Sequence, residues 1–253
     1  MFSTPFDETA VSLLESLNAP AYKIASFELV DLPLIQRVAK TGKPLLMSTG
    51  MATHDEISEA VETARSAGCT SLLLFHCISS YPAPIEQTNL RQIRNLKKTF
   101  DVTVGLSDHT IGTAAAIAAV ALGACAIEKN FTLSRADRGP DSEFSIEPDD
   151  LKVLVRETRE AWSALGKEGF GRPKAELGSR VFRRSIYFVN NLKSGTRITE
   201  KDIRRIRPGF GLPPKYFDTI VGKRVTRDVA RGEAVTWDLI QDSELIRPEA
   251  AAR

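Results

Sequence analysis

Short apolar runs alternate with amphipathic stretches over the first 165 residues of this 253-residue chain. Five short runs have the character of strands, and most turn abruptly polar at their ends: Ala21–Ala25, Pro44–Ser48, Leu72–Cys77, Val102–Leu106 and Ala126–Asn130. Four segments between them have helical periodicity: Glu8–Leu17, Leu32–Ala39, Ile57–Ala67 and Thr113–Leu122. Asp7 and Thr53 stand where N-caps are expected. The alternation predicts an α/β fold of parallel βα units.

The spacing of these units is typical of a (β/α) barrel. Lys23, Ser48, His76, Leu106 and Glu128 mark successive strands and follow one another at intervals of about 22 to 30 residues. Met1–Phe6 is expected to supply one more strand end ahead of them. In such a barrel the carboxyl ends of the strands form the active face.

The amino-acid composition changes after residue 165. Residues 166–184 are rich in Gly, Lys, Arg and Glu and are expected to form an exposed linker. A small β-rich domain is expected over 185–245. In it, Gly195–Ile203 and Gly232–Ile240 resemble each other at an offset of 37 residues, which suggests a module with pseudo-twofold symmetry.

Composition excludes several classes of protein. The 34 basic and 32 acidic residues nearly balance, which argues against a nucleic-acid or membrane-surface partner. The three cysteines show no CxxC spacing, so neither a disulfide framework nor a zinc cluster is indicated. The first residues lack the basic and apolar regions of a signal peptide. We therefore expect a cytoplasmic protein.

Two lysines within strands, Lys23 and Lys129, are the sharpest chemical signal. A lysine that projects into a barrel mouth loses hydration unless an anion or carboxylate meets it. Hydroxyls and amides at neighbouring strand ends would add directional donors for a small phosphorylated or carboxylated substrate. The alternative is that the lysines only pair with Glu28 and Glu128.

The positions of the histidines and cysteines predict different roles for them. His109 follows Ser107 and Asp108 at a strand end, which favours a role in metal binding or proton transfer. His76 is expected to be structural and His54 to begin a helix at the surface. Cys77 and Cys125 lie in apolar runs and are expected to be core thiols.

Several ordered motifs together resemble the sialic acid synthase (NeuB-like) family, and most of all its pseudaminic acid synthase branch. The resemblance runs from Phe2 to about Ile240. It rests on Thr4–Phe6, Tyr22–Glu28, Ser48–Thr53, Gly105–His109, Glu128–Lys129, Gly139–Asp141 and Arg207–Tyr216.

The resemblance implies a TIM barrel followed by an antifreeze-like (SAF, β-clip) domain. It also implies a transferase of carbohydrate biosynthesis that condenses phosphoenolpyruvate with an N-acetylated hexosamine, here a 6-deoxy-2,4-diacetamido-altrose, and releases phosphate. The divalent metal would be Mn²⁺ or Mg²⁺. The expected assembly is a homodimer with swapped SAF domains.

The same resemblance implies roles for individual residues. Phosphoenolpyruvate would be held by residues from several strand ends, with the two lysines neutralising its charge: Thr4, Lys23, Ser26, Ser79, Ser107 and Lys129. Catalysis would depend on Lys23, Lys129 and His109. Tyr81 and Asp141 would contact the sugar hydroxyls, and Arg207 would reach the sugar in the other subunit.

Two departures from the family pattern bear on activity. The first recognisable motif corresponds to the family's third strand end, so an arc that lacks strands one and two is expected. Asn130 stands where the family has a second metal-binding histidine, which leaves His109 with a weak amide partner. Three interpretations stay open: a truncated synthase with little activity, an enzyme completed by other material, and a non-catalytic sugar-binding relative. An N-acetylneuraminate synthase is the alternative activity.

Overall fold

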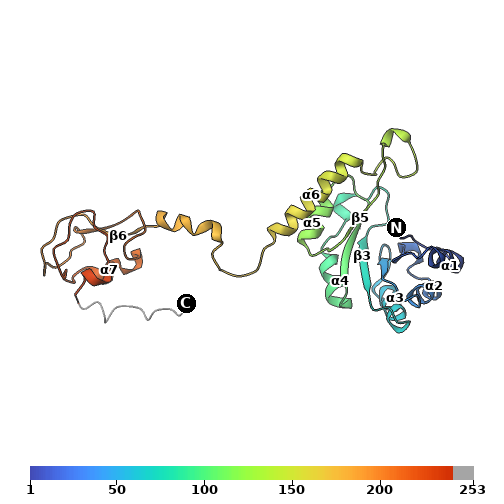
Figure 1. Cartoon of the computed structure of the whole chain (residues 1–253), viewed down its shortest axis with the longest axis horizontal. Coiled ribbons are helices and arrows are strands. Elements are labelled where there is room, and N and C mark those ends of the chain that lie inside the picture. Colours follow the sequence, from blue (N-terminus) through green and yellow to red (C-terminus); the bar gives the residue numbers. More distant parts are fainter. Residues whose placement is uncertain (242–253) are drawn as a thin grey trace. The chain divides into compact units, whose positions relative to one another are not determined.

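The computed structural model describes residues 1–241, and the chain divides into two compact units, Met1–Lys167 and a second that begins at Glu168 (Figure 1). The first expected domain ends two residues before the first unit does. The last four residues of the expected range 185–245 lie outside the described residues. Each unit is treated separately below.

The first unit is built on a parallel sheet with the order β1-β2-β3-β4-β5. Its strands are β1 (Tyr22–Ile24), β2 (Leu45–Ser48), β3 (Leu72–Cys77), β4 (Thr103–Asp108) and β5 (Ile127–Lys129). A bridge between Ser3 and Tyr22 continues the sheet beyond β1, as expected for Met1–Phe6. All five expected strands are present, and their order follows the chain as in an arc of a (β/α) barrel.

Helices α1 (Glu8–Ser16), α2 (Leu32–Ala39), α3 (His54–Ser66), α4 (Gln92–Phe100) and α5 (Ala114–Ala121) each precede a strand of the sheet, and α6 (Pro148–Ala164) follows β5. Both expected N-caps are confirmed. The Asp7 carboxylate accepts a hydrogen bond from the Ala10 amide, and Thr53 forms a capping box with Glu56. The sequence prediction did not include α4 and α6. The buried residues of α4, Ile93, Leu96 and Phe100, recur along one face, so an amphipathic pattern was present there and was not recognised.

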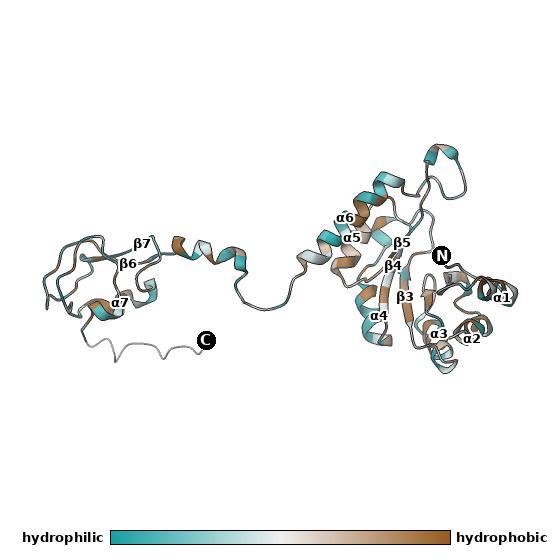
Figure 2. Ribbon diagram, in the orientation of Figure 1, coloured by the Kyte–Doolittle hydropathy of each residue, from teal (hydrophilic) through white to brown (hydrophobic). Residues whose placement is uncertain are grey.

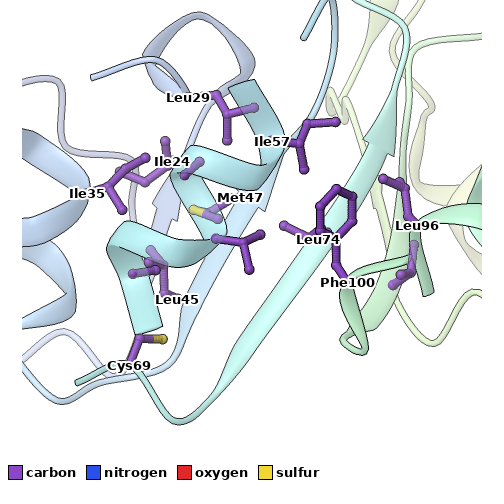
Figure 3. Packing of buried hydrophobic residues seen from close by; sticks show 14 of the residues in the cluster. Ile24, Leu29, Ile35, Leu45, Met47, Ile57, Cys69, Leu74, Leu96 and Phe100 are labelled. Carbon is purple, nitrogen blue, oxygen red and sulfur yellow. The ribbon is translucent and has the colours of Figure 1, made fainter. Parts of the chain in front are cut away.

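The core lies between the helices and one face of the sheet. Residues in register across the strands share a face, and Ile24, Met47 and Leu74 form such a row. Figure 3 shows this row packing against Ile35 of α2 and Ile57 of α3. Because side chains alternate along a strand, the residues one position away face the opposite side. This opposite face, called the inner face below, points away from the helices and carries polar residues at the strand ends.

The second unit contains β6 (Ser185–Phe188), β7 (Ile203–Ile206) and the short α7 (Phe217–Ile220). β6 and β7 are antiparallel. The expected repeat is confirmed by the pairing of its two halves. The Leu192 and Val229 amides donate to each other's carbonyls, and these residues are 37 positions apart. The bridges Tyr187–Ala234 and Arg197–Arg224 are related by the same offset. The unit is therefore pseudo-twofold.

Figure 2 shows that helices of both units carry hydrophilic and apolar residues together. Within residues 1–241, no helix combines the length and the apolar character that crossing a membrane requires.

Candidate active site at the carboxyl ends of the strands

Three inward-facing residues form the charged part of the candidate site. The Lys23 ammonium donates to Glu128 Oε1 at 2.9 Å, and the Ser107 hydroxyl donates to the same oxygen at 2.7 Å. Ser107 and Glu128 are register partners on β4 and β5, and the long Lys23 side chain reaches them from β1. The Lys23 side chain is 8% exposed and that of Glu128 is 38% exposed. Two donors thus converge on one carboxylate oxygen.

Lys129 lies elsewhere, which differs from the expectation that it binds an anion beside Lys23. Its ammonium donates to Asp108 Oδ2 at 2.8 Å and to the Thr110 carbonyl at 2.7 Å. Lys129 and Asp108 are register partners one position beyond Ser107 and Glu128, so they occupy the opposite face of the sheet. Their side chains are 3% and 1% exposed. The structure therefore gives Lys129 a buried structural pairing with Asp108, where the sequence alternative offered Glu28 or Glu128.

A second cluster brings Ser26, Ser79 and Cys77 together around Gly50. The Ser26 hydroxyl donates to Cys77 Sγ at 3.5 Å and accepts from the Gly50 amide at 3.2 Å. Ser79 Oγ lies 3.9 Å from the same sulfur. A Cβ on Gly50 would collide with Ser79 Oγ and approach Ser26 Oγ to 2.8 Å. Glycine is therefore what lets the two hydroxyls converge.

His109 is oriented by a backbone carbonyl. Its Nδ1 lies 2.9 Å from the Ile78 oxygen, and since a carbonyl only accepts, Nδ1 carries the proton. Nε2 remains open to a ligand. Burial alone would lower the pKa of His109, but hydrogen bonds to Cys77 and Ile78 outweigh it and raise that pKa. The Tyr81 ring packs on the imidazole at 4.3 Å between centroids, so two predicted site residues are in contact.

The two cysteines expected in the core differ: Cys77 is buried as expected, and Cys125 is not. Cys77 is buried, yet its neighbours are polar, and hydrogen bonds from His109 and Ser26 outweigh burial and hold the pKa of its thiol below the ordinary value. Cys125, expected in the core, is exposed. His76 is buried as expected, donates to the Thr88 carbonyl at 2.7 Å, and has a pKa lowered by burial. His54 begins α3 and is exposed, also as expected.

The residues proposed for a metal offer a sparse donor set. Asn130 Nδ2 lies 3.5 Å from Asp141 Oδ2, so an amide and a carboxylate are adjacent. Within residues 1–241, no group of three or more His, Cys, Asp or Glu residues lies close enough to hold a metal ion. His109 Nε2 is suited to one coordination position, because its other nitrogen is fixed by a carbonyl. A hard cation that keeps several waters fits this set better than a fully protein-bound ion.

The remaining predicted residues are placed as follows. Thr4 is half-buried and follows the Ser3 bridge beside β1. Arg207 is exposed, lies directly after β7 in the second unit, and precedes a cis proline.

Sequence reasoning assigned no site role to two inward groups, Glu128 and Ser48. Glu128 was considered as part of a family motif and as a partner for a lysine, and its register position facing Ser107 makes it the acceptor for both inner donors. Ser48 ends β2 with a buried hydroxyl that has no hydrogen-bond partner among the described residues. The register that pairs Cys77 with Ser107 and Ser107 with Glu128 places Glu128 on the inner face. The inner cluster can bind an anionic oxygen through an ammonium and several hydroxyls.

Comparisons with known proteins agree on the family. Residues 1–169 match the model of the NeuB family, and residues 183–241 match that of the SAF domain. A pseudaminic acid synthase of Helicobacter pylori is 40% identical over 244 residues, covering 96% of this chain and 72% of that protein. The crystal structure of a spore coat polysaccharide biosynthesis protein of Bacillus subtilis superposes with a TM-score of 0.63 at 34% identity, covering 94% of this chain and 72% of the other.

A third relative was solved with a bound ligand. The structure of an N-acetylneuraminic acid (sialic acid) synthetase of Leptospira borgpetersenii, solved in complex with citrate, has a TM-score of 0.66 at 34% identity. The match covers 70% of this chain and 61% of that one.

Proposed function

The chain belongs to the NeuB family and carries a SAF domain, and from this premise we propose that it is a phosphoenolpyruvate-dependent synthase of nonulosonic acids, of the pseudaminic acid synthase type. The substrates are phosphoenolpyruvate and an N-acetylated 6-deoxyhexosamine. The alternative is synthesis of N-acetylneuraminate, which the likeness to the Leptospira enzyme supports.

The observation that carries this proposal is the convergence of Lys23 and Ser107 on one carboxylate oxygen at the strand ends. An ammonium and a hydroxyl that already bind a carboxylate can bind a carboxylate or phosphate of phosphoenolpyruvate in the same way. Ser26, Ser79 and Thr4 are further donors proposed for that ligand. The citrate bound by the Leptospira relative is likewise a carboxylate ligand.

The reaction has two bond-forming steps. The methylene carbon of phosphoenolpyruvate attacks the aldehyde carbon of the open-chain sugar, and the aldehyde oxygen becomes a hydroxyl. Water then adds to the former C2 of phosphoenolpyruvate, and phosphate leaves as the keto acid forms. Lys23 balances the charge of the departing anion, and Tyr81 and Asp141 orient the sugar. In this proposal Lys129 supports the sheet and touches no substrate.

We also propose His109 and Asn130 as ligands of a divalent Mn²⁺ or Mg²⁺ ion, with water completing its coordination. When bound, the ion supplies Lewis-acid polarisation of the aldehyde oxygen. The imidazole can serve because Ile78 fixes its tautomer and leaves Nε2 free.

A cytoplasmic homodimer completes the proposal, in which Arg207 of the partner subunit contacts the sugar. Charge favours association between copies. Residues 1–167 contain 16 basic and 21 acidic residues, whereas residues 168–253 contain 18 and 11. Light scattering at tens of micromolar protein should give about twice the 27.8 kDa chain mass, and a mass that stays at the monomer value would refute the dimer.

The function is tested by incubating the full chain with phosphoenolpyruvate, Mn²⁺ and either 6-deoxy-2,4-diacetamido-altrose or an N-acetylated hexosamine without the 4-acetamido group. Phosphate release should depend on the sugar and match the nonulosonic acid found by mass spectrometry. Lys23→Ala should abolish most of it, and Lys152→Ala on α6 is a matched surface control. Absence of both products with either sugar would contradict the proposal.

A further inference from the structure

We propose that Glu128 is an internal competitor for the anion site: its carboxylate occupies the place of a ligand oxygen on Lys23 and Ser107, and a bound anion displaces it. The inference rests on the proposed function only in identifying the natural anion as phosphoenolpyruvate and its product phosphate. Glu128 acts here as a positioning residue.

The hydrogen bonds define that place. Glu128 Oε1 receives the Lys23 ammonium at 2.9 Å and the Ser107 hydroxyl at 2.7 Å, the contacts that an oxygen of a bound phosphate would make. Both donors are buried, with Lys23 at 7% and Ser107 at 3% of full exposure. They are therefore held in place by the sheet, whether the oxygen they bind belongs to the chain or to a ligand.

Exposure identifies which partner moves. The Glu128 side chain is 38% exposed, whereas that of Lys23 is 8% exposed. A half-exposed carboxylate can turn into solvent and regain hydration, but a buried ammonium cannot. Displacement therefore leaves the two donors in position and moves Glu128.

Charge explains why an exchange is needed. With Glu128 in place, the Lys23 charge is already balanced, and the other strand lysine, Lys129, is bound to Asp108 on the opposite face. A phosphate added beside the intact pair would meet a carboxylate of like charge. Without any anion, Lys23 would be a buried and unpaired cation. Glu128 thus satisfies Lys23 between turnovers and weakens the hold on the product phosphate.

The experiment measures inorganic phosphate binding to the full chain by calorimetry. Glu128→Gln keeps the size and the accepting oxygen but removes the charge. It should bind phosphate more tightly, by about fivefold or more, whereas Lys23→Ala should bind it more weakly than wild type. Glu62→Gln, at an exposed position on α3, makes the same change in net charge and should leave the affinity unchanged.

The inference is overturned if Glu128→Gln binds phosphate no more tightly than wild type, if neither protein binds it, or if Glu62→Gln tightens binding equally. Circular dichroism checks that each variant is folded, and Glu128→Ala provides a second removal of the charge with the same expected direction. Phosphate binding needs no sugar and no turnover. A chain that makes no nonulosonic acid but shows this pattern would refute the proposed function and retain the inference.

Discussion

Replacing Lys129 with methionine tests whether this lysine stabilises the fold or binds substrate. Methionine keeps most of the length of the side chain but removes its charge and its donors. Asp108 would then remain 1% exposed without a cation, although its Oδ1 would still accept from the Thr110 amide and hydroxyl at 2.9 and 2.8 Å. The Thr110 carbonyl would also lose its ammonium donor.

The expected loss in the free energy of unfolding is large, because the Lys129–Asp108 ion pair is buried. Removing one partner of a buried ion pair destabilises a protein by roughly 3–5 kcal/mol, since the remaining charge is uncompensated. The two hydrogen bonds that Asp108 retains favour the lower end of this range. A Lys129→Met/Asp108→Asn double variant should recover part of the loss, because no charge then stays buried.

Urea unfolding monitored by circular dichroism gives the free energies, and calorimetry gives phosphate affinity for the same proteins. Lys152→Met is the matched control, because Lys152 pairs with Asp149 on α6 at 2.7 Å with both side chains largely exposed. That control should show no measurable change. Lys129→Met should lose stability and, where still folded, keep the phosphate affinity of wild type.

The opposite pattern would refute this reasoning. A Lys129→Met protein with unchanged unfolding free energy and weakened phosphate binding would return Lys129 to the anion site that the sequence predicted. The face assignment from the β4–β5 register would then be wrong.

Three further predictions follow from the site. Asn130→His should tighten Mn²⁺ binding at least about tenfold by calorimetry, and an unchanged affinity would count against a metal at His109 and position 130. Burial lowers the pKa of His76 in the folded state, so the unfolded state binds more protons and stability should fall as the pH drops below about 6.5. The urea midpoint of unfolding should follow this pH dependence in wild type and lose it in His76→Gln. Gly50→Ala should lower the free energy of unfolding by about 1–3 kcal/mol, because its Cβ overpacks against Ser26 and Ser79, and should weaken phosphate binding. Gly42→Ala is the control: its Cβ position is open but its φ is positive, so it should affect stability and not phosphate affinity.

Local sequence signals were sufficient for most of the first unit. Short runs that alternate with amphipathic segments predicted each strand of the sheet, because parallel strands need a helical connection between them. Asp7 and Thr53 predicted helix starts because a cap needs only its own neighbours. Helix α6 was missed although its burial resembles that of α1, which was predicted: among the described residues, Leu154 is the one buried residue of α6 and Val11 that of α1.

The chemistry of the site depended on details that a single sequence does not contain. Lys23 and Lys129 both interrupt strands, but only the register between β4 and β5 decides that Lys129 shares a face with Asp108. Likewise, Cys77 sits in an apolar run, yet it turns towards Ser26 and His109, because the strand end faces the inner side. Strand identity follows from composition, whereas the direction of one side chain follows from pairing between segments distant in the chain.

The symmetric pairing of the second unit has a consequence for how it folds. The Leu192 and Val229 amides donate to each other's carbonyls, and the turns at Ser194 and Arg231 are each held by a side chain from the opposite half, Asp228 and Asn191. β6 and β7 pair within the first half, but the bonds between the halves form only when separations of 34 to 40 residues close. Folding of this unit should be a single cooperative event, with a rate limited by loop closure.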